Sequence, residues 1–535
     1  MDTRLFDFIH EKTPKFNRVI CDGLAVEHLK LVEEYVDRLL RSAQASFPRG
    51  LVYHGYARCT PWEQYMTSTR MRSSKRSYEI SRSDVYLVKY MFRYHGNDIR
   101  PMFLYLPYVT DGGIIRIRGA TYSISPVLAD QTISDGVDSL FVKLYKDKLT
   151  FNRSVYGFMI DNERTHTDLI ISNIHHNARK NTSKRVSGFD ATPPHYLFCK
   201  FGVTRAFKDF ANAQVHVGFE DTINTEKFPE DEWSICSSLG IKPRGIKDKE
   251  YVPSKLRMAI RKEDYNHVTA IMIGSFFYIV DHFPSQVDPD CIDITDTWLI
   301  LLGVNATGSE TKSGKILISM NTHMESLDQY VDLLSRKDLE EIGIHVTDIY
   351  QLFAYVIKTM SARIAAAGTT ISSMYGKKLT VLYYLLQDIN DAISNMHFAW
   401  RKKTKGDDNR VLTEKDIFEK YVPVETILRI SGSEHREVSN VSSSTGNKVF
   451  RITTSMRLQS EVVSGKSDDT VSVDDPMGFL HTSQAEIASF SILSRTSLTG
   501  RDTLNPFARI EPNGRVERNP EFIQLLDEIQ KNIKR

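Results

Sequence analysis

The hydrophobic pattern changes its period several times along the chain, and this alternation constrains the fold more than any other feature. Between positions 24 and 40 apolar residues recur at the i, i+3, i+4, i+7 spacing of a helix with one buried face. From 78 to 131 the pattern becomes short β-rich runs, punctuated by His95-Gly96-Asn97-Asp98 and Asp111-Gly112-Gly113. The sequence therefore predicts an α+β protein with mixed helices and antiparallel sheets joined by hairpin turns.

The rest of the chain continues this mixture. Residues 141–335 combine polar loops with four runs that we interpret as strands: SLFVKLY, AIMIGSFFYIV, WLILLGV and KILISM. Helical spacing follows at 346–367 and at 379–402. The second of these helices carries an apolar stripe that we expect to pack in a core: Leu382, Leu385, Leu386, Ile389, Ile393 and Met396. Polar or serine-rich stretches at 403–409, 439–444 and 464–475 predict loops or hinges.

Length and charge narrow the class of protein. A chain of 535 residues exceeds what one core serves, so at roughly 150 residues per domain we expect three or four domains. Lys and Arg number 69 against 67 Asp and Glu, so any contact with nucleic acid must be local. Five cysteines without a C-x-x-C pair argue against structural zinc and disulfides and favour a reducing compartment. Without a signal peptide or a membrane-spanning run, we expect a cytosolic protein, neither secreted nor bound to membrane.

Candidate catalytic motifs fail on spacing. Gly308 and Gly314 enclose five residues rather than the four of a phosphate-binding loop. The pair in Gly406-Asp407-Asp408 lies in a charged stretch and not between apolar strands. The aspartates between 288 and 296 lack the glycine of a calcium loop, and His175-His176 lacks a third ligand. We therefore expect no catalytic residue and no metal site in this chain.

A basic segment between Ala57 and Arg100 is more informative. It holds nine basic residues against four acids, a local charge of +5. The aromatic residues Trp62, Tyr65, Tyr78 and Tyr94 interleave with these charges. This mixture suits attraction of a nucleic-acid backbone together with base stacking, although an ordinary solvated face is the alternative interpretation.

Four separated segments carry motifs of a known family. The first is LPYVTDGGIIRIRG, from Leu106 to Gly119, with its continuation to Gln131. The second is MYGKKL at 374–379, and the third is the stretch 446–465, which contains VFRITTSMRLQSEVVSG. The fourth combines Ser483-Gln484 with SRTSLTGRD at 494–502.

In this order the segments resemble the second-largest (β) subunit of multisubunit DNA-directed RNA polymerases. The first is similar to the P-x-M-T-x-x-G-x-F-I-I-N-G hairpin of the protrusion, with Arg118 in place of the family's Asn. The second resembles F-G-[NK]-[KR]-R-L at the start of a long helix, and the third resembles the stretch before the fork. The fourth resembles the fork motif L-R-R-T-x-T-x-x-G-R-D. Because the family's later E-T-P-E-G segment is absent, the chain resembles the N-terminal half of β, in the split form of giant-bacteriophage polymerases.

The resemblance implies a domain organisation. Residues 1–140 and 336–430 would form the two parts of a protrusion-like domain, with long helices in the second part. Residues 141–335 would form an inserted lobe-like domain, and 431–535 a fork-like region. In the family the metal-binding loop belongs to β′, so Mg²⁺ would be held by a β′-like partner, with no cofactor bound by this chain.

The resemblance also implies partners and site residues. The partners would be a C-terminal β-like chain, β′-like chains, the DNA template and the RNA product; the need for a promoter-specificity subunit stays open. Combined with the basic segment, it gives these candidate nucleic-acid-binding residues: Arg70, Arg72, Lys75, Arg76, Gln484, Arg495, Arg501 and Arg509. The candidate motif and interface residues are Tyr375, Gly376, Lys377, Lys378 and Asp502. For the arginines near the fork-like loop, ion pairs within the protein are the alternative use.

Two other functions remain compatible with the residues. A phage structural or packaging-associated protein would also be large, near neutral and without catalytic motifs. A free-standing binder of single-stranded nucleic acid would need only the basic and aromatic segment from 57 to 100. These alternatives differ in what the chain binds, so purification separates them.

Overall fold

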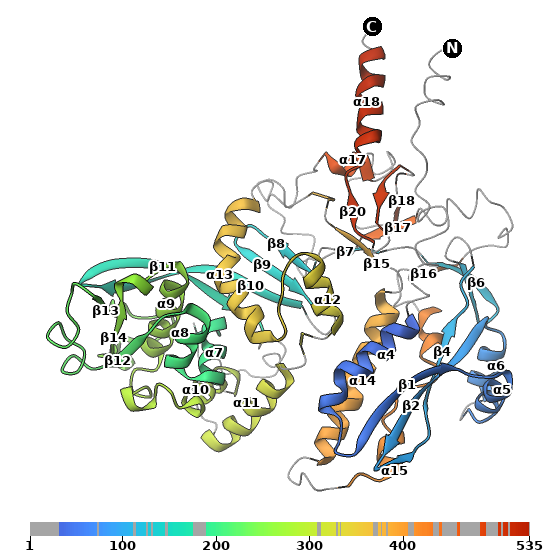
Figure 1. Ribbon diagram of the computed structural model, residues 1–535, viewed down its shortest axis with the longest axis horizontal. Helices are drawn as coiled ribbons and strands as arrows, with labels where there is room; N and C mark the ends of the chain where they lie inside the picture. Colours follow the sequence, from blue (N-terminus) through green and yellow to red (C-terminus); the bar gives the residue numbers. More distant parts are fainter. Residues whose placement is uncertain are drawn as a thin grey trace. The chain divides into compact units, whose positions relative to one another are not determined.

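The computed structural model divides into two compact units, which are described separately (Figure 1). Unit 1 comprises residues 1–131 and 372–535, and unit 2 comprises residues 132–371, so unit 2 is an insertion in the chain of unit 1. The α+β class with antiparallel sheets is confirmed. The structure describes residues 32–71, 74–110, 114–124, 127–129, 132–144, 148–174, 189–307, 312–327, 330–331, 333–367, 373–375, 377–380, 383–404, 411–431, 438–440, 457–460, 482–487, 501–503, 505, 507–511 and 514–533.

Unit 1 contains an antiparallel sheet in the order β1-β2-β3, with β4 also paired to β2. Its strands are β1 Leu51–Arg58, β2 Val85–Tyr94, β3 Asn97–Asp98 and β4 Met102–Pro107. Helix α4 (Val32–Ser42) packs on β1, and helix α14 (Tyr383–Thr404) packs on α4, as Figure 1 shows. The aromatic contacts of Phe47 with Phe92 and Trp400 join these elements in one core.

Several sequence predictions in unit 1 are confirmed. Two of the β-rich runs predicted between 78 and 131 form strands: VYLVKYMF lies in β2, and the first six residues of MFLYLPYV form β4. The turn between β2 and β3 places His95 and Gly96 at φ 47° and 86°. The predicted N-terminal helix is present as α4 in the part of the chain that the structure describes. The helix predicted at 379–402 is wrong at its start, because Lys378–Thr380 forms strand β15 and the helix begins at Tyr383.

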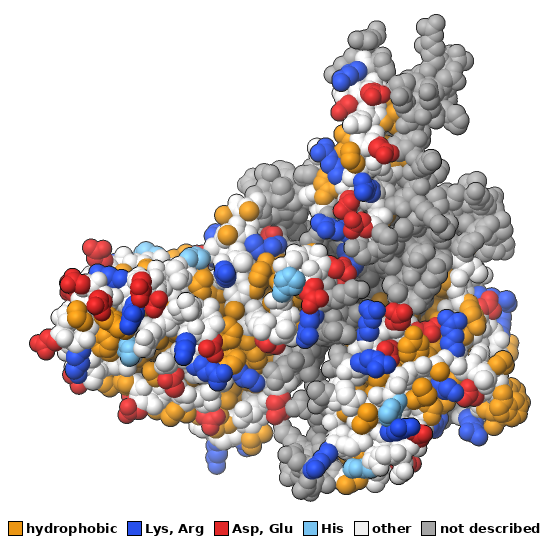
Figure 2. All heavy atoms as spheres, in the orientation of Figure 1, with side chains coloured by type: hydrophobic (Ala, Val, Ile, Leu, Met, Phe, Trp, Pro, Cys, Tyr) orange, Lys and Arg blue, Asp and Glu red, His pale blue; other side chains and the backbone are white. Residues whose placement is uncertain are grey.

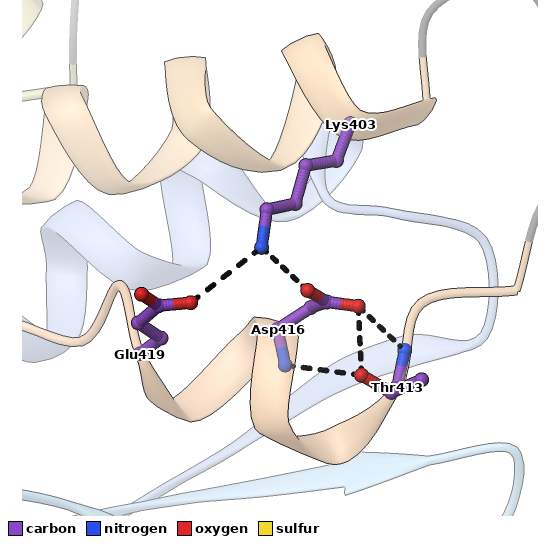
Figure 3. A network of polar contacts seen from close by, with 4 residues as sticks. All are labelled: Lys403, Thr413, Asp416 and Glu419. Atoms are coloured by element: carbon purple, nitrogen blue, oxygen red, sulfur yellow. Dashed lines mark hydrogen bonds and ion pairs between the residues drawn. The ribbon is translucent and has the colours of Figure 1, made fainter.

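The C-terminal end of α14 is fastened by a polar network (Figure 3). The Lys403 ammonium contacts Asp416 at 2.5 Å and Glu419 at 3.8 Å. Asp416 also closes a capping box with Thr413 at the start of helix α15 (Glu414–Phe418). The hydrogen bond from Lys403, followed by those from Thr413, lowers the pKa of Asp416 to about 2. Gly406-Asp407-Asp408, which sequence analysis rejected as a metal pair, lies outside the described residues.

Unit 1 contains further helices and strands. They comprise α5 Pro61–Thr69, α6 Ser74–Ser81, β5 Ile114–Ile117, β6 Ala120–Ile124, β7 Val127–Ala129, η7 Thr426–Ser431, β16 Val438–Asn440, β17 Arg457–Ser460, α17 Ser483–Ile487, β18 Arg501–Thr503, β19 Arg509–Ile510, β20 Val516–Glu517 and α18 Pro520–Ile533. Strand β6 pairs with β5 and β16, whereas β7 belongs to a second sheet described below.

Unit 2 is built on a sheet in the order β12-β14-β13-β10-β9-β8, with β11 paired to β10. Its strands are β8 Ile133–Asp135, β9 Ser139–Lys143, β10 Lys148–Ile160, β11 Glu163–Ser172, β12 Val215–Gly218, β13 Trp233–Ser238 and β14 Arg257–Arg261. Its helices are α7 Pro193–Phe201, α8 Val203–Ala211, α9 His267–His282, α10 Thr295–Thr307, α11 Ser313–Leu327, α12 Leu333–Glu341 and α13 Ile349–Ala367. Helix α9 is the centre of this unit, because it packs on β10, β11 and β13 as well as on α7, α8 and α13.

Three of the four runs that we interpreted as strands are helices. AIMIGSFFYIV lies in α9, WLILLGV in α10 and KILISM in α11; only SLFVKLY contains a strand, β9. Helix α9 is covered on all sides, so its sequence carries no polar stripe and its helical period is hidden. The missed signal was the capping box formed by Asn266 and Thr269, ahead of an apolar run longer than a typical strand.

The division into units also differs from the predicted domain limits. Residues 336–371 were assigned to the second protrusion-like part, but α12 and α13 belong to unit 2. Phe353 of α13 lies in the unit 2 core, with ring centroids 6.2 Å from Phe151 and 5.4 Å from Tyr196. Hydropathy locates such a helix but does not identify the core that receives its apolar face.

A substitution at Gly303 tests how closely α10 packs on α11. A Cβ atom at Gly303 would lie 2.2 Å from Ile316 and 2.7 Å from Met320. We expect Gly303→Ala to lower the free energy of unfolding by about 1–3 kcal/mol through overpacking. Gly314→Ala is the matched control, because nothing lies within 4 Å of its Cβ position; it should be neutral or stabilise by up to about 1 kcal/mol. Calorimetric unfolding of both variants measures the difference, and equal losses would contradict the close contact.

Candidate functional site

The four sequence segments contribute one strand each to a single sheet in the order β15-β7-β17-β18. We call it the motif sheet. Strand β7 comes from the continuation of the first segment, β15 from the second, β17 from the third and β18 from the fourth. Leu128 of β7 pairs with Leu379 on one side and with Ser460 on the other, and Leu458 of β17 pairs with Asp502. Segments far apart in sequence are therefore neighbours in one hydrogen-bonded structure.

The second and fourth segments also meet outside the sheet. The buried Ser483 Oγ accepts a hydrogen bond of 2.8 Å from the backbone N–H of Met374. The Tyr375 hydroxyl donates to the carboxylate of Glu486. Burial, followed by this hydrogen bond, raises the pKa of Tyr375, so the phenol stays protonated and keeps its donor role. Helix α17 is therefore held against the start of the second segment.

Strand β15 has a further neighbour on its outer side. The N–H of Leu379 donates to the Gly514 carbonyl at 2.7 Å, and the N–H of Val516 donates to the Lys377 carbonyl at 2.9 Å. Lys378 forms a β-bridge with Arg515. The two predicted interface lysines are partly buried and belong to this backbone network.

Some of the predicted site residues of the fork-like region lie in described elements, and others lie outside the described residues. Arg501 and Asp502 lie in β18, where they pair with Gln459 and Leu458, and Gln484 lies in α17. Arg509 is exposed on β19, and its Nε lies 3.5 Å from Glu517, so the ion-pair alternative applies at least to this arginine. Three predicted site residues lie outside the described residues: Arg72, Gly376 and Arg495.

Arg118 occupies the position at which the resembling β-subunit hairpin motif has Asn. Strands β5 and β6 are joined by a two-residue turn in which Arg118 and Gly119 have φ of 56° and 79°. Positive φ at both positions is the type I′ hairpin geometry that favours Asn-Gly. Arg118 is held there by a 2.8 Å hydrogen bond from its N–H to Ser83 Oγ and by its guanidinium, 3.5 Å from Glu79.

Helices α5 and α6 carry the basic and aromatic segment. Helix α5 starts with a capping box of Thr60 and Glu63 and buries none of its residues, and α6 buries only Ile80. Trp62, Tyr65 and Tyr78 are 68%, 58% and 62% exposed. We call the exposed side chains of these two helices and their ends the α5–α6 surface: Trp62, Tyr65, Arg70, Lys75, Tyr78 and Arg82. Figure 2 shows apolar and basic side chains together over these helices.

Two rings of the α5–α6 surface lie close to one another, and the third lies close to a cation. Trp62 and Tyr65 are stacked, with centroids 5.8 Å apart and planes 30° apart. The Arg82 guanidinium lies 5.5 Å from the centre of the Tyr78 ring. The prediction that Tyr94 takes part in stacking is wrong, because Tyr94 is buried on the inner face of β2.

The basic residues of the segment fall into two groups. Among the described residues, four make ion pairs: Arg58 with Glu33, Arg76 with Glu425, Lys89 with Glu63 and Arg93 with Asp98. By contrast, no ion pair is made within the described part of the chain by Arg70, Lys75, Arg82 or Arg100. Their charge is available to an outside ligand.

Unit 2 contains one polar chain that superficially resembles a nucleophile site. His267 Nε2 lies 3.1 Å from Ser361 Oγ, and Ser361 Oγ donates to Asp168 at 2.5 Å. The aspartate contacts the serine and not the histidine, so it does not orient the imidazole as a base. Within the described ranges, no group of three metal-ligating side chains occurs and no helix is long and apolar enough to cross a bilayer.

Comparison with known proteins identifies the family to which the chain belongs. The family described as non-virion RNA polymerase subunit matches residues 3–531. The chain therefore belongs to the family of non-virion RNA polymerase subunits and is a component of an RNA polymerase. No curated protein matches the chain.

Ser483 tests the junction between the second and fourth segments. We expect Ser483→Ala to lower the free energy of unfolding of unit 1 by about 1–3 kcal/mol, because the buried N–H of Met374 would lose its acceptor. Thr482→Ala, at the exposed neighbouring position, should change stability by less than about 0.5 kcal/mol. Thermal unfolding of both variants measures the contrast. A Ser483→Ala variant as stable as Thr482→Ala would show that this hydrogen bond does not hold the segments together.

Proposed function

We propose that this chain is the N-terminal β-like subunit of a split multisubunit DNA-dependent RNA polymerase, and that it shapes the channel for DNA and RNA during transcription. The observation that carries the proposal is the motif sheet. The four segments that resemble β in sequence order are brought together as adjacent strands, as segments of one functional region would be. Membership of a family of RNA polymerase subunits supports the part of the proposal that assigns the chain to a polymerase.

Such a chain would act mainly through electrostatic attraction of the nucleic-acid backbone. A polymerase must hold duplex and hybrid through the phosphate backbone, because contacts to particular bases would prevent movement along the template. Arg501 on β18, and Arg495 earlier in the same sequence segment, would supply guanidinium groups for this purpose. The protrusion-like and lobe-like roles of units 1 and 2 belong to the same proposal.

The chemistry of nucleotide addition would be completed by other chains. A β′-like partner would hold the Mg²⁺ ions for two-metal phosphoryl transfer, and a C-terminal β-like chain would supply the other half of β. This chain would then position nucleic acid without providing a catalytic residue. We place the assembly in the cytoplasm of an infected host or in a phage-made compartment.

The other two candidate functions have less support. The family description names an RNA polymerase and not a structural or packaging protein. A free-standing single-strand binder would require only the α5–α6 surface and would leave the motif sheet unexplained. Both alternatives predict that the chain purifies without polymerase-like partners.

Affinity purification of the tagged chain from infected cells tests the assignment. We expect a stable complex with several large chains, one carrying an E-T-P-E-G-like segment and another a D-F-D-G-D-like segment, and template-dependent RNA synthesis by that complex. Recovery of the chain alone, or only with virus particles, would refute the proposal.

Arginines 495 and 501 test the proposed grip on phosphates. Arg495→Ala combined with Arg501→Ala should leave assembly intact but weaken template retention. The slope of log affinity against log salt should fall by about one for each phosphate that the variant no longer binds. Lys208→Ala, at an exposed position of α8, is the matched control for removal of a surface charge. Transcription and salt dependence equal to those of the control would remove both arginines from the site.

A further inference from the structure

The α5–α6 surface is poorly explained by the fold of unit 1. An exposed tryptophan and two exposed tyrosines lie on two short helices that contribute almost nothing to a core. Single exposed apolar residues are ordinary, but several aromatic rings gathered on one face mark an interaction site. The chemistry around the rings decides which partner they fit.

The charge balance favours an anionic partner. Of the three acids between 58 and 84, Glu63 is bound to Lys89 at 2.7 Å and Glu79 to Arg118 at 3.5 Å. The hydrogen bond from Lys89 lowers the pKa of Glu63, which keeps that pair ionised. Asp84 is then the remaining acid, against the three cations Arg70, Lys75 and Arg82. The surface therefore presents excess positive charge around its aromatic rings.

The aromatic rings favour unpaired bases over a duplex. Bases in a duplex are stacked on one another and expose only their edges, whereas bases of a single strand can stack on protein rings. The Trp62 and Tyr65 rings are already stacked with most of their surface open, so a base can extend the stack at little cost in side-chain entropy. Arg70 follows directly at the C-terminal end of α5, where it can contact a phosphate of the same strand.

We propose that the α5–α6 surface binds an unpaired nucleic-acid strand, with Trp62 and Tyr65 stacking on bases and with Arg70 and Lys75 contacting phosphates. This inference depends on the side chains of α5 and α6 and not on the β-like assignment. It goes beyond the proposed grip on phosphates, because stacking distinguishes a single strand from a duplex.

Binding of labelled oligonucleotides to the full chain tests the proposal by fluorescence anisotropy. One mixed sequence is used as single-stranded DNA, as single-stranded RNA and as duplex DNA. Trp62→Ala combined with Tyr65→Ala should weaken binding of the preferred single strand roughly 5- to 100-fold, as removal of one stacked base does, and leave duplex binding unchanged. Phe398→Ala, at another exposed aromatic position in unit 1, should change neither. The tighter of the two single strands identifies the natural ligand.

Tryptophan emission gives a second readout of stacking. Of the four tryptophans, Trp298 and Trp400 are fully buried, Trp233 is partly buried and Trp62 is largely exposed, so a strand stacked on Trp62 should quench the component of emission that Trp62 contributes. Trp62→Phe should retain most of the affinity, because phenylalanine also stacks, but should lose that quenching. Because α5 buries no residue, these variants should melt like the parent protein.

Two outcomes would overturn the proposal. In the first, the double variant binds single strands as tightly as the Phe398→Ala control does. In the second, single-strand binding is unchanged but the double variant no longer co-purifies with polymerase chains, which would make the surface a protein-docking site. Neither outcome affects the β-like assignment, which depends on the composition of the purified complex.

Discussion

Backbone pairing on both edges of strand β7 is the constraint on which the organisation of unit 1 depends. Val127–Ala129 pairs antiparallel with β15 and parallel with β17. The chain leaves unit 1 just after β7 and returns to it just before β15, so the whole of unit 2 is inserted between two neighbouring strands. Loop-closure entropy grows only slowly with length, so a folded insertion here costs little once its own ends are close. The two units can therefore have separate cores in one uninterrupted chain.

The positive charge of the α5–α6 surface depends on ion pairs that occupy the nearby acids, and the net charge of the whole chain does not reveal it. The chain as a whole carries a formal charge of only +2. Next to the α5–α6 surface, Glu63 forms an ion pair with Lys89, and Glu79 forms one with Arg118. Neither of these two basic residues belongs to the surface. The remaining cations keep an uncompensated field that acts over about 10 Å at moderate salt. A subunit of a larger assembly can thus attract nucleic acid at one place while most of its surface stays neutral.

The sequence predicts those elements whose local pattern is unambiguous. Strand β2 follows from its β-rich run, the turn at His95 from turn chemistry and the apolar stripe of α14 from helical period. Helices α9 and α10 were mistaken for strands because burial on most sides leaves few polar positions to reveal a helical period. Helix α11 buries one face only, and the spacing of Ile316, Met320, Met324 and Leu327 that shows this continues beyond the short run KILISM. The i, i+3 spacing of Trp62 and Tyr65 after the capping residue Thr60 could have placed both rings on one helix face. Convergence of the four segments on β7 depends on long-range backbone pairing, which local patterns do not contain.

The hairpin of β5 and β6 connects the α5–α6 surface to the part of the chain that leads into the motif sheet. The Gly119 N–H donates to the carbonyl of Arg82 at 2.7 Å, and a Cβ at Gly119 would lie 2.6 Å from the Arg82 guanidinium. The positive φ of Gly119 favours glycine there, whereas the Arg82 guanidinium could move away from a Cβ atom. Because β6 pairs with β16 and the chain then runs directly into β7, this turn fixes the C-terminal end of α6 to the element that leads into the motif sheet. The α5–α6 surface is thereby tied to the rest of unit 1 by backbone hydrogen bonds, whereas a surface on a free loop would move independently of the sheets.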